Sequence, residues 1–341
     1  MDRVVIVGGG ISGLSLAYFL LKEKPSMDLI LLEAEERLGG KIWTDGSDGF
    51  VCESGVNGFL NNKPRTLELS AGLLLTPLKS NDAARKRFIF SEGRLRALPE
   101  SPAAFFSSDL LSVWGRIRII YELFAAKGSK EDESLAEFGR RRLGKEAFEK
   151  LIDPMASGIY AGDPEALSLK SCFPRIHQLE AEHGSLIRAL VKLQIKAKKE
   201  GKAGPGPGPG GVLTSFSSGM ETLIVALKSV VGDKVRSRCR VMSLERSGNR
   251  YAVSLEDGLI IESDAVVLAT PAHASSDILR DFDPVLATTL SQIPYPAVAV
   301  VCMGYRKERI GRNLDGFGFL VPFREGRRIL GTLWDSSIFP G

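Results

Sequence analysis

Three consecutive glycines, Gly8–Gly10, followed by Gly13, constrain this 341-residue chain more than any other feature. They come directly after a short β-branched segment, Arg3–Val7, and before an apolar stretch that suits a buried helix. In a strand–turn–helix unit these glycines permit a tight turn, close approach of a pyrophosphate and close helix–strand packing, while the helix N-terminus supplies donors and a positive dipole end. The predicted phosphate-binding turn comprises Gly8, Gly9, Gly10, Ile11, Ser12 and Gly13.

An acidic residue stands where such a unit needs one. A second apolar run, Leu29–Leu32, predicts a second buried strand, and Glu33 follows it twenty residues after Gly13. An acid at this point accepts hydrogen bonds from adenosine ribose hydroxyls. The alternative, a glycine-rich turn without a ligand, is disfavoured by this context. The pattern predicts a doubly wound α/β fold that binds a dinucleotide.

The stretch Val4–Leu21 has no charged residue, so its length also matches a membrane span or a signal sequence. Four of its residues are glycines, and Asp2 stands where a signal peptide carries basic residues. A soluble βα unit is therefore the better interpretation.

Charge and cysteine usage exclude other classes of protein. The net charge of +4, from 45 basic and 41 acidic residues, is too small and too mixed to indicate a nucleic-acid partner. The four cysteines lie far apart without a CxxC pair and are accompanied by three histidines, so neither a disulfide framework nor a metal site is predicted. A reducing cytoplasm fits this usage.

The chain changes character twice along its length. Helical spacing dominates from about Ser101 to Lys202, which predicts a helical insertion with helices over Leu110–Phe124, Ser134–Leu151 and Ser185–Lys199. The run Gly204–Gly211 predicts a Gly/Pro linker. Beyond it, a β-meander is predicted from Val235–Glu245, Arg250–Leu255 and Leu259–Glu262. The apolar run Ala265–Ala269 predicts another strand of the parallel sheet. Further strand candidates are Ala297–Gly304, Gly316–Pro322 and Ile329–Trp334.

These signals predict three parts. Residues 1–60 and 211–284 form a discontinuous nucleotide-binding domain. Residues 61–100 and 285–341 form a mixed β substrate domain, and residues 101–203 form the helical insertion with its linker.

A second glycine pair indicates that the predicted dinucleotide is a flavin and not a nicotinamide dinucleotide. Arg37-Leu38-Gly39-Gly40-Lys41 follows Glu33 and Ala34, and resembles the RxGG segment that runs along the FAD diphosphate in the flavin amine oxidase superfamily. Glu53-Ser54-Gly55-Val56-Asn57-Gly58 resembles the next flavin-contacting loop of that superfamily, with Gly55, Val56, Asn57 and Gly58 as the predicted contacts. Val241 falls where the superfamily uses a backbone contact to adenine, although Val241 taken alone is more often an ordinary strand residue. The resemblance implies FAD as the cofactor.

Four further segments resemble the oxygen-dependent protoporphyrinogen and coproporphyrinogen III oxidases within that superfamily. They are Lys86-Arg87-Phe88 with Leu98-Pro99, Ser157–Asp163, Ser171–Pro174 and Gly316–Pro322. The resemblance implies oxidation of a porphyrinogen to a porphyrin, with molecular oxygen as acceptor, in heme biosynthesis. It does not distinguish protoporphyrinogen IX from coproporphyrinogen III. Another flavin oxidoreductase, or a non-catalytic remnant that binds nucleotide or porphyrin, remains an alternative.

The same resemblance suggests substrate contacts. Arg87 would pair with a substrate propionate, a bidentate contact that lysine matches poorly, or else it is a solvated surface residue. Phe317, Gly318 and Leu320 would line a flat cavity, or else they are strand core. No catalytic side chain is predicted, because the cofactor carries the hydride step.

By the same resemblance, the helical insertion corresponds to the family's membrane-associating domain. Trp114, Arg118 and Tyr121 combine apolar, basic and aromatic character, which suits either an interfacial surface or a solvated helix face. We expect a cytoplasmic protein that contacts a membrane peripherally if this surface is interfacial, and a homodimer as its assembly. Members of the family continue beyond the point where this sequence ends, so we expect the flavin site to be incomplete without a further segment.

Overall fold

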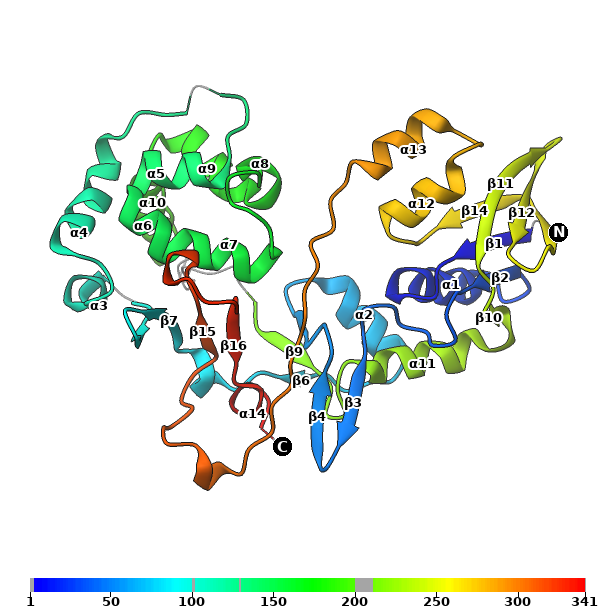
Figure 1. The fold of residues 1–341 in the computed structure, drawn as a ribbon, viewed down its shortest axis with the longest axis horizontal. Coiled ribbons are helices and arrows are strands. Elements are labelled where there is room, and N and C mark those ends of the chain that lie inside the picture. The colour runs from blue at the N-terminus through cyan, green and yellow to red at the C-terminus, as the bar shows by residue number, and fades with distance from the viewer. Residues whose placement is uncertain (1–2, 100–101, 129, 200–210, 341) are drawn as a thin grey trace. The chain divides into compact units, whose positions relative to one another are not determined.

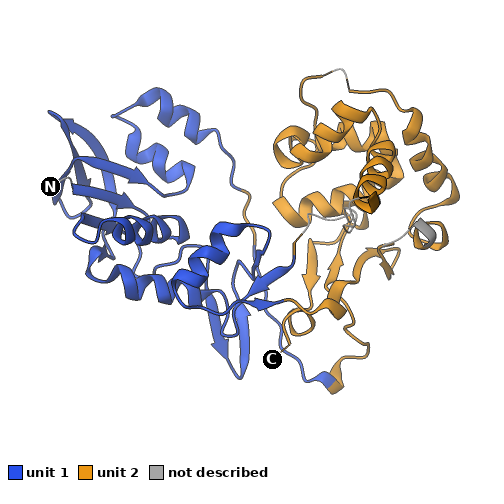
Figure 2. Cartoon of the chain, turned by 180° about the vertical axis from the view of Figure 1, so that it is seen from behind, with its two compact units in different colours: residues 1–79, 212–295, 299–307 blue, residues 80–211, 296–298, 308–341 orange. Residues whose placement is uncertain are grey.

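The structure is a computed structural model that describes residues 3–99, 102–128, 130–199 and 211–340. It divides into two compact units, shown in different colours in Figure 2. Unit 1 contains residues 1–79, 212–295 and 299–307, and unit 2 contains residues 80–211, 296–298 and 308–341. The division into nucleotide, substrate and helical parts stays a prediction.

A four-stranded parallel sheet forms the centre of unit 1, in the order β10-β2-β1-β14 (Figure 1). The strands are β1 Arg3–Val7, β2 Asp28–Leu32, β10 Val235–Arg236 and β14 Ala265–Leu268. Two come from the start of the chain and two from beyond residue 211, so the predicted discontinuous α/β fold is confirmed. One detail was wrong: β10 pairs with β2 in this sheet instead of opening the meander.

Apolar residues cover both faces of the sheet because neighbouring residues of a strand point to opposite sides. Ile6 and Leu31 face one cluster together with α1 and α11, whereas Val7 and Leu32 face another together with the meander. This two-sided burial explains the unbroken apolar runs in the sequence. The elements that cover the sheet are α1 Ile11–Glu23, α11 Glu221–Val231, η4 Gly232–Lys234, β11 Val241–Ser247, β12 Arg250–Leu255, β13 Ile260–Ser263, α12 Ala272–Leu279 and α13 Pro284–Ser291.

Short strands complete unit 1. The hairpin of β3 and β4 is antiparallel, and β9 lies between β5 and β6. The elements are β3 Thr44–Ser47, β4 Phe50–Glu53, β5 Phe59–Leu60, α2 Pro64–Gly72, β6 Leu78–Lys79 and β9 Leu213–Ser215. The short helix η5 Lys307–Arg309 begins at the last residue of unit 1 and continues in unit 2.

The predicted strand Ala297–Gly304 is not a strand. Residues 294–306 form neither helix nor strand and are exposed. A strand requires a neighbouring strand that accepts and donates its backbone hydrogen bonds. Within the described residues no ladder includes this segment, so its apolar β-branched composition was a misleading signal.

Unit 2 contains a four-stranded mixed sheet in the order β16-β15-β7-β8. Strand β15 runs parallel to β7, and the other pairs are antiparallel. The elements are η1 Asp82–Arg85, β7 Arg87–Ser91, β8 Arg94–Ala97, β15 Gly318–Leu320, η6 Phe323–Glu325, β16 Gly331–Leu333 and α14 Asp335–Ile338. The predicted strands Gly316–Pro322 and Ile329–Trp334 are therefore confirmed as shorter strands.

Helices make up the rest of unit 2. They are α3 Pro102–Ser107, α4 Val113–Ile120, η2 Tyr121–Phe124, α5 Leu135–Leu143, α6 Lys145–Ala147, η3 Phe148–Ile152, α7 Asp153–Tyr160, α8 Leu169–Cys172, α9 Pro174–His183 and α10 Leu186–Lys199. Helix α5 begins with a capping box of Ser134 and Glu137 and ends at Gly144, whose φ of 89° interrupts a helix expected to continue to Leu151. The predicted linker, except for Gly211, lies outside the described residues.

Within the described part of the chain, no helix has the length and apolar character needed to cross a membrane.

Candidate functional site

The first glycine turn connects β1 to α1. Gly8 has a φ of 109°, and a Cβ on Gly13 would lie 2.0 Å from Gly8 O, so both positions require glycine. Gly10 is the N-cap of α1 and has no side chain to cap the helix. The first N–H groups of a helix need acceptors from outside the helix. Ile11 and Ser12 begin α1 beside this turn, which can therefore receive an anion.

Glu33 is held at the end of β2 by backbone bonds on both sides. Glu33 N donates to Arg236 O, and Cys239 N donates to Glu33 O, so the loop after β10 fixes its position. Its carboxylate accepts hydrogen bonds from Gly9 N at 2.6 Å and from Glu35 N at 2.9 Å. A carboxylate has roughly four acceptor positions, so this one retains capacity for ribose hydroxyls.

The second glycine turn is hydrogen-bonded to the first. Gly39 N donates to Gly9 O at 2.9 Å, and Gly39 also forms a parallel bridge with Gly10. Gly39 and Gly40 have φ values of 101° and 57°. A Cβ on Gly40 would lie 3.4 Å from Gly10 Cα. The structure thus brings the two glycine turns, predicted separately from the sequence, next to each other.

The loop at residues 55–58 contacts Lys41, which follows the second glycine turn, and Thr214 of β9. A Cβ on Gly55 would lie 2.6 Å from Lys41 O, and one on Gly58 would lie 2.7 Å from Thr214 O. Both glycines therefore allow backbone segments to touch. Val56 is exposed and Asn57 is half-buried between them.

Lys41 is exposed and its ammonium lies 5.2 Å from the centre of the Tyr295 ring. Tyr295 also packs edge-on against His273, and its hydroxyl accepts a hydrogen bond from Ala272 N. Sequence reasoning missed this aromatic support because Tyr295 lies far along the chain in a segment without regular structure.

Residues after β14 border the first glycine turn from the other side. A Cβ on Gly8 would lie 2.8 Å from Ala269 O and 3.2 Å from Thr270 Cγ2. Ligands of open α/β sheets bind beyond the carboxyl ends of the strands. That rule was the available signal, because Thr270 directly follows a predicted sheet strand.

Val241 begins β11 and is buried against Val5 and Leu32. Two residues earlier, Cys239 is bonded to Glu33 O. Val241 therefore lies in the segment that borders Glu33, and its contact with adenine stays a prediction. Ala34 follows Glu33 and is half-buried.

The predicted substrate residues lie in unit 2. Arg87 begins β7, is exposed, and lies with its guanidinium 5.5 Å from the centre of the Phe317 ring. Its neighbours Arg85 and Lys86 are paired with Asp82 and Asp315. Among the described residues no carboxylate pairs with Arg87, which leaves its charge available to an anionic ligand.

Backbone packing already accounts for Gly318. It has a φ of 136°, and a Cβ there would lie 2.0 Å from Thr332 O of β16. The Leu320 side chain packs on Gly158 of α7, whose added Cβ would meet it at 2.6 Å. The structure thus places both residues in the packing of unit 2, and a role in lining a substrate cavity stays a prediction.

A surface pocket of about 420 Å³ lies elsewhere in unit 1. It is lined by Leu244, Glu245, Arg246, Asp281 and Phe282. None of these residues belongs to the predicted site, so this pocket does not define it.

Comparison with known proteins decides the family. The profile of the flavin containing amine oxidoreductases matches residues 11–341. The chain belongs to this family. The FAD-binding fold and FAD as the family's cofactor, both predicted from the glycine turns, are confirmed.

Two relatives are named for the oxidation of porphyrinogens. The chain is 37% identical to protoporphyrinogen oxidase 1, chloroplastic, of Arabidopsis thaliana, over 98% of its own length and 66% of that protein. It is 32% identical to coproporphyrinogen III oxidase of Bacillus subtilis, over 99% of its own length and 74% of that protein. The chain thus spans about two thirds of the length of its chloroplast relatives.

Solved structures agree with this assignment. A crystal structure from Exiguobacterium sp. 255-15, provisionally named a protoporphyrinogen oxidase, superposes with a TM-score of 0.78 at 26% identity, covering 99% of this chain and 74% of that one. Putrescine oxidase superposes with a TM-score of 0.54 at 17% identity, covering 81% of this chain and 60% of that one, which shows a shared fold.

The residues present fit FAD. The helix N-terminus at Gly10 offers uncapped N–H groups, and a Cβ on Gly10 would meet no atom closer than 4.0 Å. Lys41 adds a positive charge, and Glu33 adds an acceptor. An anion flanked by ribose hydroxyls is the ligand that this donor and acceptor set favours.

Proposed function

We propose that this protein oxidises a porphyrinogen, protoporphyrinogen IX or coproporphyrinogen III, to the porphyrin with molecular oxygen as acceptor. The observation that carries the proposal is the pair of hydrogen-bonded glycine turns beside Glu33, in a chain whose curated relatives are named for these two oxidations. When bound, FAD supplies the two-electron acceptor that oxygen reoxidises.

The chain's own residues bind and orient. The N-terminus of α1 and Lys41 hold the diphosphate, Glu33 accepts from the ribose hydroxyls, and the Gly39–Gly40 turn lets the dinucleotide lie close to the backbone. In unit 2, Arg87 pairs with a substrate propionate through two parallel N–H···O bonds. No acid or base is assigned in this scheme.

The test supplies both porphyrinogens to the protein, expressed with any segment that its gene encodes beyond residue 341, and follows porphyrin fluorescence. We expect one of them to be oxidised, with Arg87→Ala raising KM and leaving FAD content unchanged. Lys86→Ala is the matched control, since Lys86 already pairs with Asp315 at 2.7 Å. Normal FAD content without oxidation of either porphyrinogen would leave a nucleotide-binding protein of another function.

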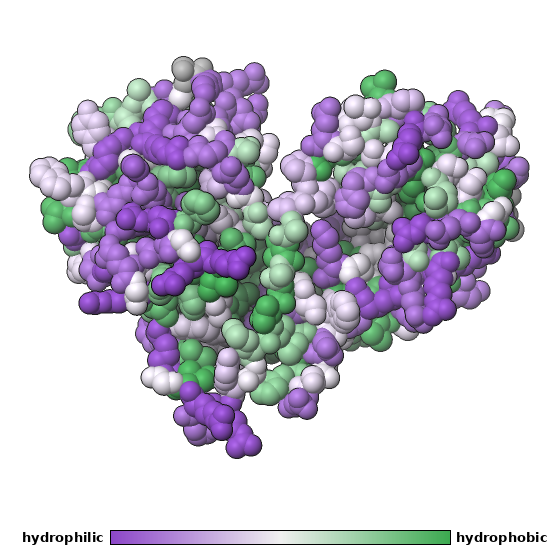
Figure 3. Space-filling model, in the orientation of Figure 1, coloured by the Kyte–Doolittle hydropathy of each residue, from purple (hydrophilic) through white to green (hydrophobic). Residues whose placement is uncertain are grey.

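We also propose a cytoplasmic protein whose unit 2 touches a membrane surface. Exposed apolar residues gather on α4 and η2. Figure 3 shows green atoms among white and purple ones on the left of the view, where Figure 1 labels α4. Trp114 is 79% exposed and Phe124 is 72% exposed. Arg118 lies 5.7 Å from the Tyr121 ring, so a cation borders the apolar residues. This combination suits the interface of an anionic bilayer.

Sedimentation with phosphatidylglycerol vesicles tests this contact. The double variant Trp114→Ala, Phe124→Ala should lose most of its vesicle binding. Phe323→Ala is the control, because Phe323 is 89% exposed on η6, outside the α4–η2 surface. Equal losses in both variants, or no binding by the unaltered protein, would contradict the proposal.

A further inference from the structure

Arg37 turns its guanidinium toward the backbone of its own loop. Nη1 donates to Leu38 O at 2.9 Å and to Ile42 O at 2.8 Å, and Nη2 donates to Gly40 O. The guanidinium also lies 4.7 Å from the centre of the Trp43 ring. One cation therefore gathers three carbonyls of the second glycine turn.

Binding of these carbonyls by Arg37 also determines where the N–H groups of the following residues point. In a trans peptide bond, the C=O of one residue and the N–H of the next point in opposite directions within their shared plane. With Leu38 O bound to Arg37, Gly39 N–H points away, and it donates to Gly9 O as this requires. With Gly40 O bound in the same way, the Lys41 N–H also lies on the side away from Arg37.

Lys41 supplies the charge that Arg37 does not. Its exposed ammonium lies over the Tyr295 ring, and within the described residues no carboxylate forms an ion pair with it. The guanidinium of Arg37, in contrast, is half-buried and already committed to carbonyl oxygens. The two cations of this segment thus have different surroundings.

We propose that Arg37 is a positioning residue that folds the Gly39–Gly40 turn for the diphosphate of FAD without touching it, while Lys41 meets the diphosphate directly. The inference rests on the proposed function for its ligand. Arginine is required because its planar fork reaches several carbonyls at once, whereas an ammonium is a point charge.

The salt dependence of FAD affinity distinguishes a positioning role of Arg37 from direct contact by Lys41. Removing a direct contact between a cation and a phosphate weakens the dependence of affinity on salt, because exposed charges are screened. We expect Arg37→Gln to weaken FAD binding by about tenfold or more, since hydrogen bonds to a charged group are lost, with an unchanged slope of log Kd against log salt concentration. Lys41→Gln should reduce that slope.

Controls fix the interpretation of the titrations. Arg37→Lys should not restore affinity, and Arg65→Gln, at an exposed arginine of α2 paired with Glu68, should change neither affinity nor slope. A reduced slope in Arg37→Gln would show direct contact and overturn the proposal. Unchanged affinity in Arg37→Gln would overturn it as well.

Hydrogen exchange without ligand provides an independent test. The amides of Gly39 and Ile42, which donate to Gly9 O and Gly39 O, should exchange faster in Arg37→Gln but not in Lys41→Gln, with β1 amides unchanged in both. Equal acceleration in β1 would mean general destabilisation, and no acceleration would mean that the turn does not need Arg37. Either result overturns the inference. If the unaltered protein, expressed with any segment that its gene encodes beyond residue 341, failed to bind FAD, the proposed function would be refuted, and the exchange result would still decide the role of Arg37.

Discussion

Different kinds of interaction stabilise the interior of each unit. In unit 1, a parallel sheet is buried on both faces by apolar side chains, with Leu14, Leu29 and Leu31 at most 1% exposed. In unit 2, the helical part has a smaller apolar cluster around Leu135 and Phe138, and beside it a set of buried charges. The same chain therefore combines a nonpolar core with an ionic one.

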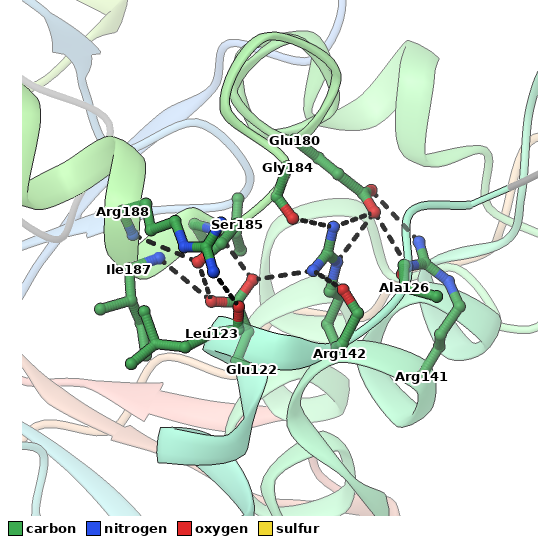
Figure 4. Close-up of polar contacts among 12 residues, drawn as sticks. Glu122, Leu123, Ala126, Arg141, Arg142, Glu180, Gly184, Ser185, Ile187 and Arg188 are labelled. Atoms are coloured by element: carbon green, nitrogen blue, oxygen red, sulfur yellow. Dashed lines mark hydrogen bonds and ion pairs between the residues drawn. The ribbon is translucent and has the colours of Figure 1, made fainter.

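Arg142 is the centre of the ionic core (Figure 4). It is fully buried, donates to Glu180 through Nε at 2.8 Å, and lies 3.2 Å from the buried Glu122. Its remaining donors reach the carbonyls of Ala125 and Gly184. These contacts connect four segments, η2 with the residue after it, α5, α9, and the turn before α10.

Glu122 has a second role in this network. Its carboxylate accepts hydrogen bonds from Ser185 Oγ at 2.6 Å and from the N–H groups of Leu186 and Ile187. Those N–H groups belong to the first turn of α10, where a helix lacks internal acceptors and favours negative charge. Glu122 thus fixes the start of α10 as well as the place of Arg142.

The comparison teaches that burial stabilises the two units differently. Apolar burial is nondirectional, so a nonpolar core tolerates changes of shape when volume is kept. A buried ion pair loses hydration, and removing one partner leaves the other charge without compensation. Unit 2 should therefore depend more sharply on single residues.

The largest effect is expected for Arg142→Ala. It leaves Glu122 and Glu180 buried without their shared cation, which should destabilise unit 2 by about 3–5 kcal/mol. Denaturant unfolding, monitored by hydrogen exchange of peptides from each unit, measures the loss of stability of unit 2. A loss in unit 2 of under about 1 kcal/mol, the range of exposed pairs, would show that the ionic core does not hold the helices.

The nonpolar counterpart is Leu31→Ala in β2. Leu31 is fully buried, so the cavity should cost unit 1 about 2–5 kcal/mol. Leu31→Met keeps the volume and should cost below about 1.5 kcal/mol. Equal losses for the two substitutions would contradict the view that cavity formation dominates in unit 1.

The stability of unit 2 should depend on pH through its buried ion pairs. Burial by itself raises the pKa of Glu180, but hydrogen bonds from Arg141 and Arg142 outweigh it and hold the pKa below its ordinary value of 4.5. Since this pKa is depressed by folding, the stabilisation is present above about pH 4.5 and is lost as pH falls through the folded-state pKa.

Glu180→Gln tests that dependence. At pH 7 it should cost unit 2 about 1.5–3 kcal/mol, because charge-assisted hydrogen bonds become neutral ones. It should also flatten the loss of stability of unit 2 between pH 5 and 3, measured by unfolding at each pH. A profile parallel to that of the unaltered protein would show that other carboxylates dominate.

The smallest effect is expected for Arg140→Ala, one position from Arg141 on the same helix. Arg140 is 46% exposed and pairs with Glu165, itself 51% exposed. Exposed pairs contribute roughly 0–1 kcal/mol. A loss as large as that of Arg142→Ala would mean that burial does not distinguish the two arginines.

Local signals predicted much of unit 1. The strand Arg3–Val7 has the predicted bounds, and Ala265–Leu268 pairs with it as expected for an apolar run between turns. The glycine turns were equally readable because few other residues adopt the required φ or fit the space. The roles of individual site residues stay predictions, since contact with a ligand is a property of the complex.

Some failures came from signals that depend on partners. Ala297–Gly304 has strand composition without a ladder, and β10 joined the parallel sheet because its edge position beside β2 was available. Strand composition describes a surface that fits a sheet, not the identity of the neighbouring strand.

By itself, the sequence determined the βα dinucleotide unit, its glycine turns and the family resemblance, because steric limits on φ and apolar periodicity act over a few neighbouring residues. Only the tertiary structure decided that Arg37 faces its own loop and that Arg142 is buried among carboxylates. Arg142 and Glu180 are 38 residues apart in sequence. In a single sequence such charges look like those of any solvated helix, because the free energy of an ion pair depends on desolvation and geometry that only the folded chain defines.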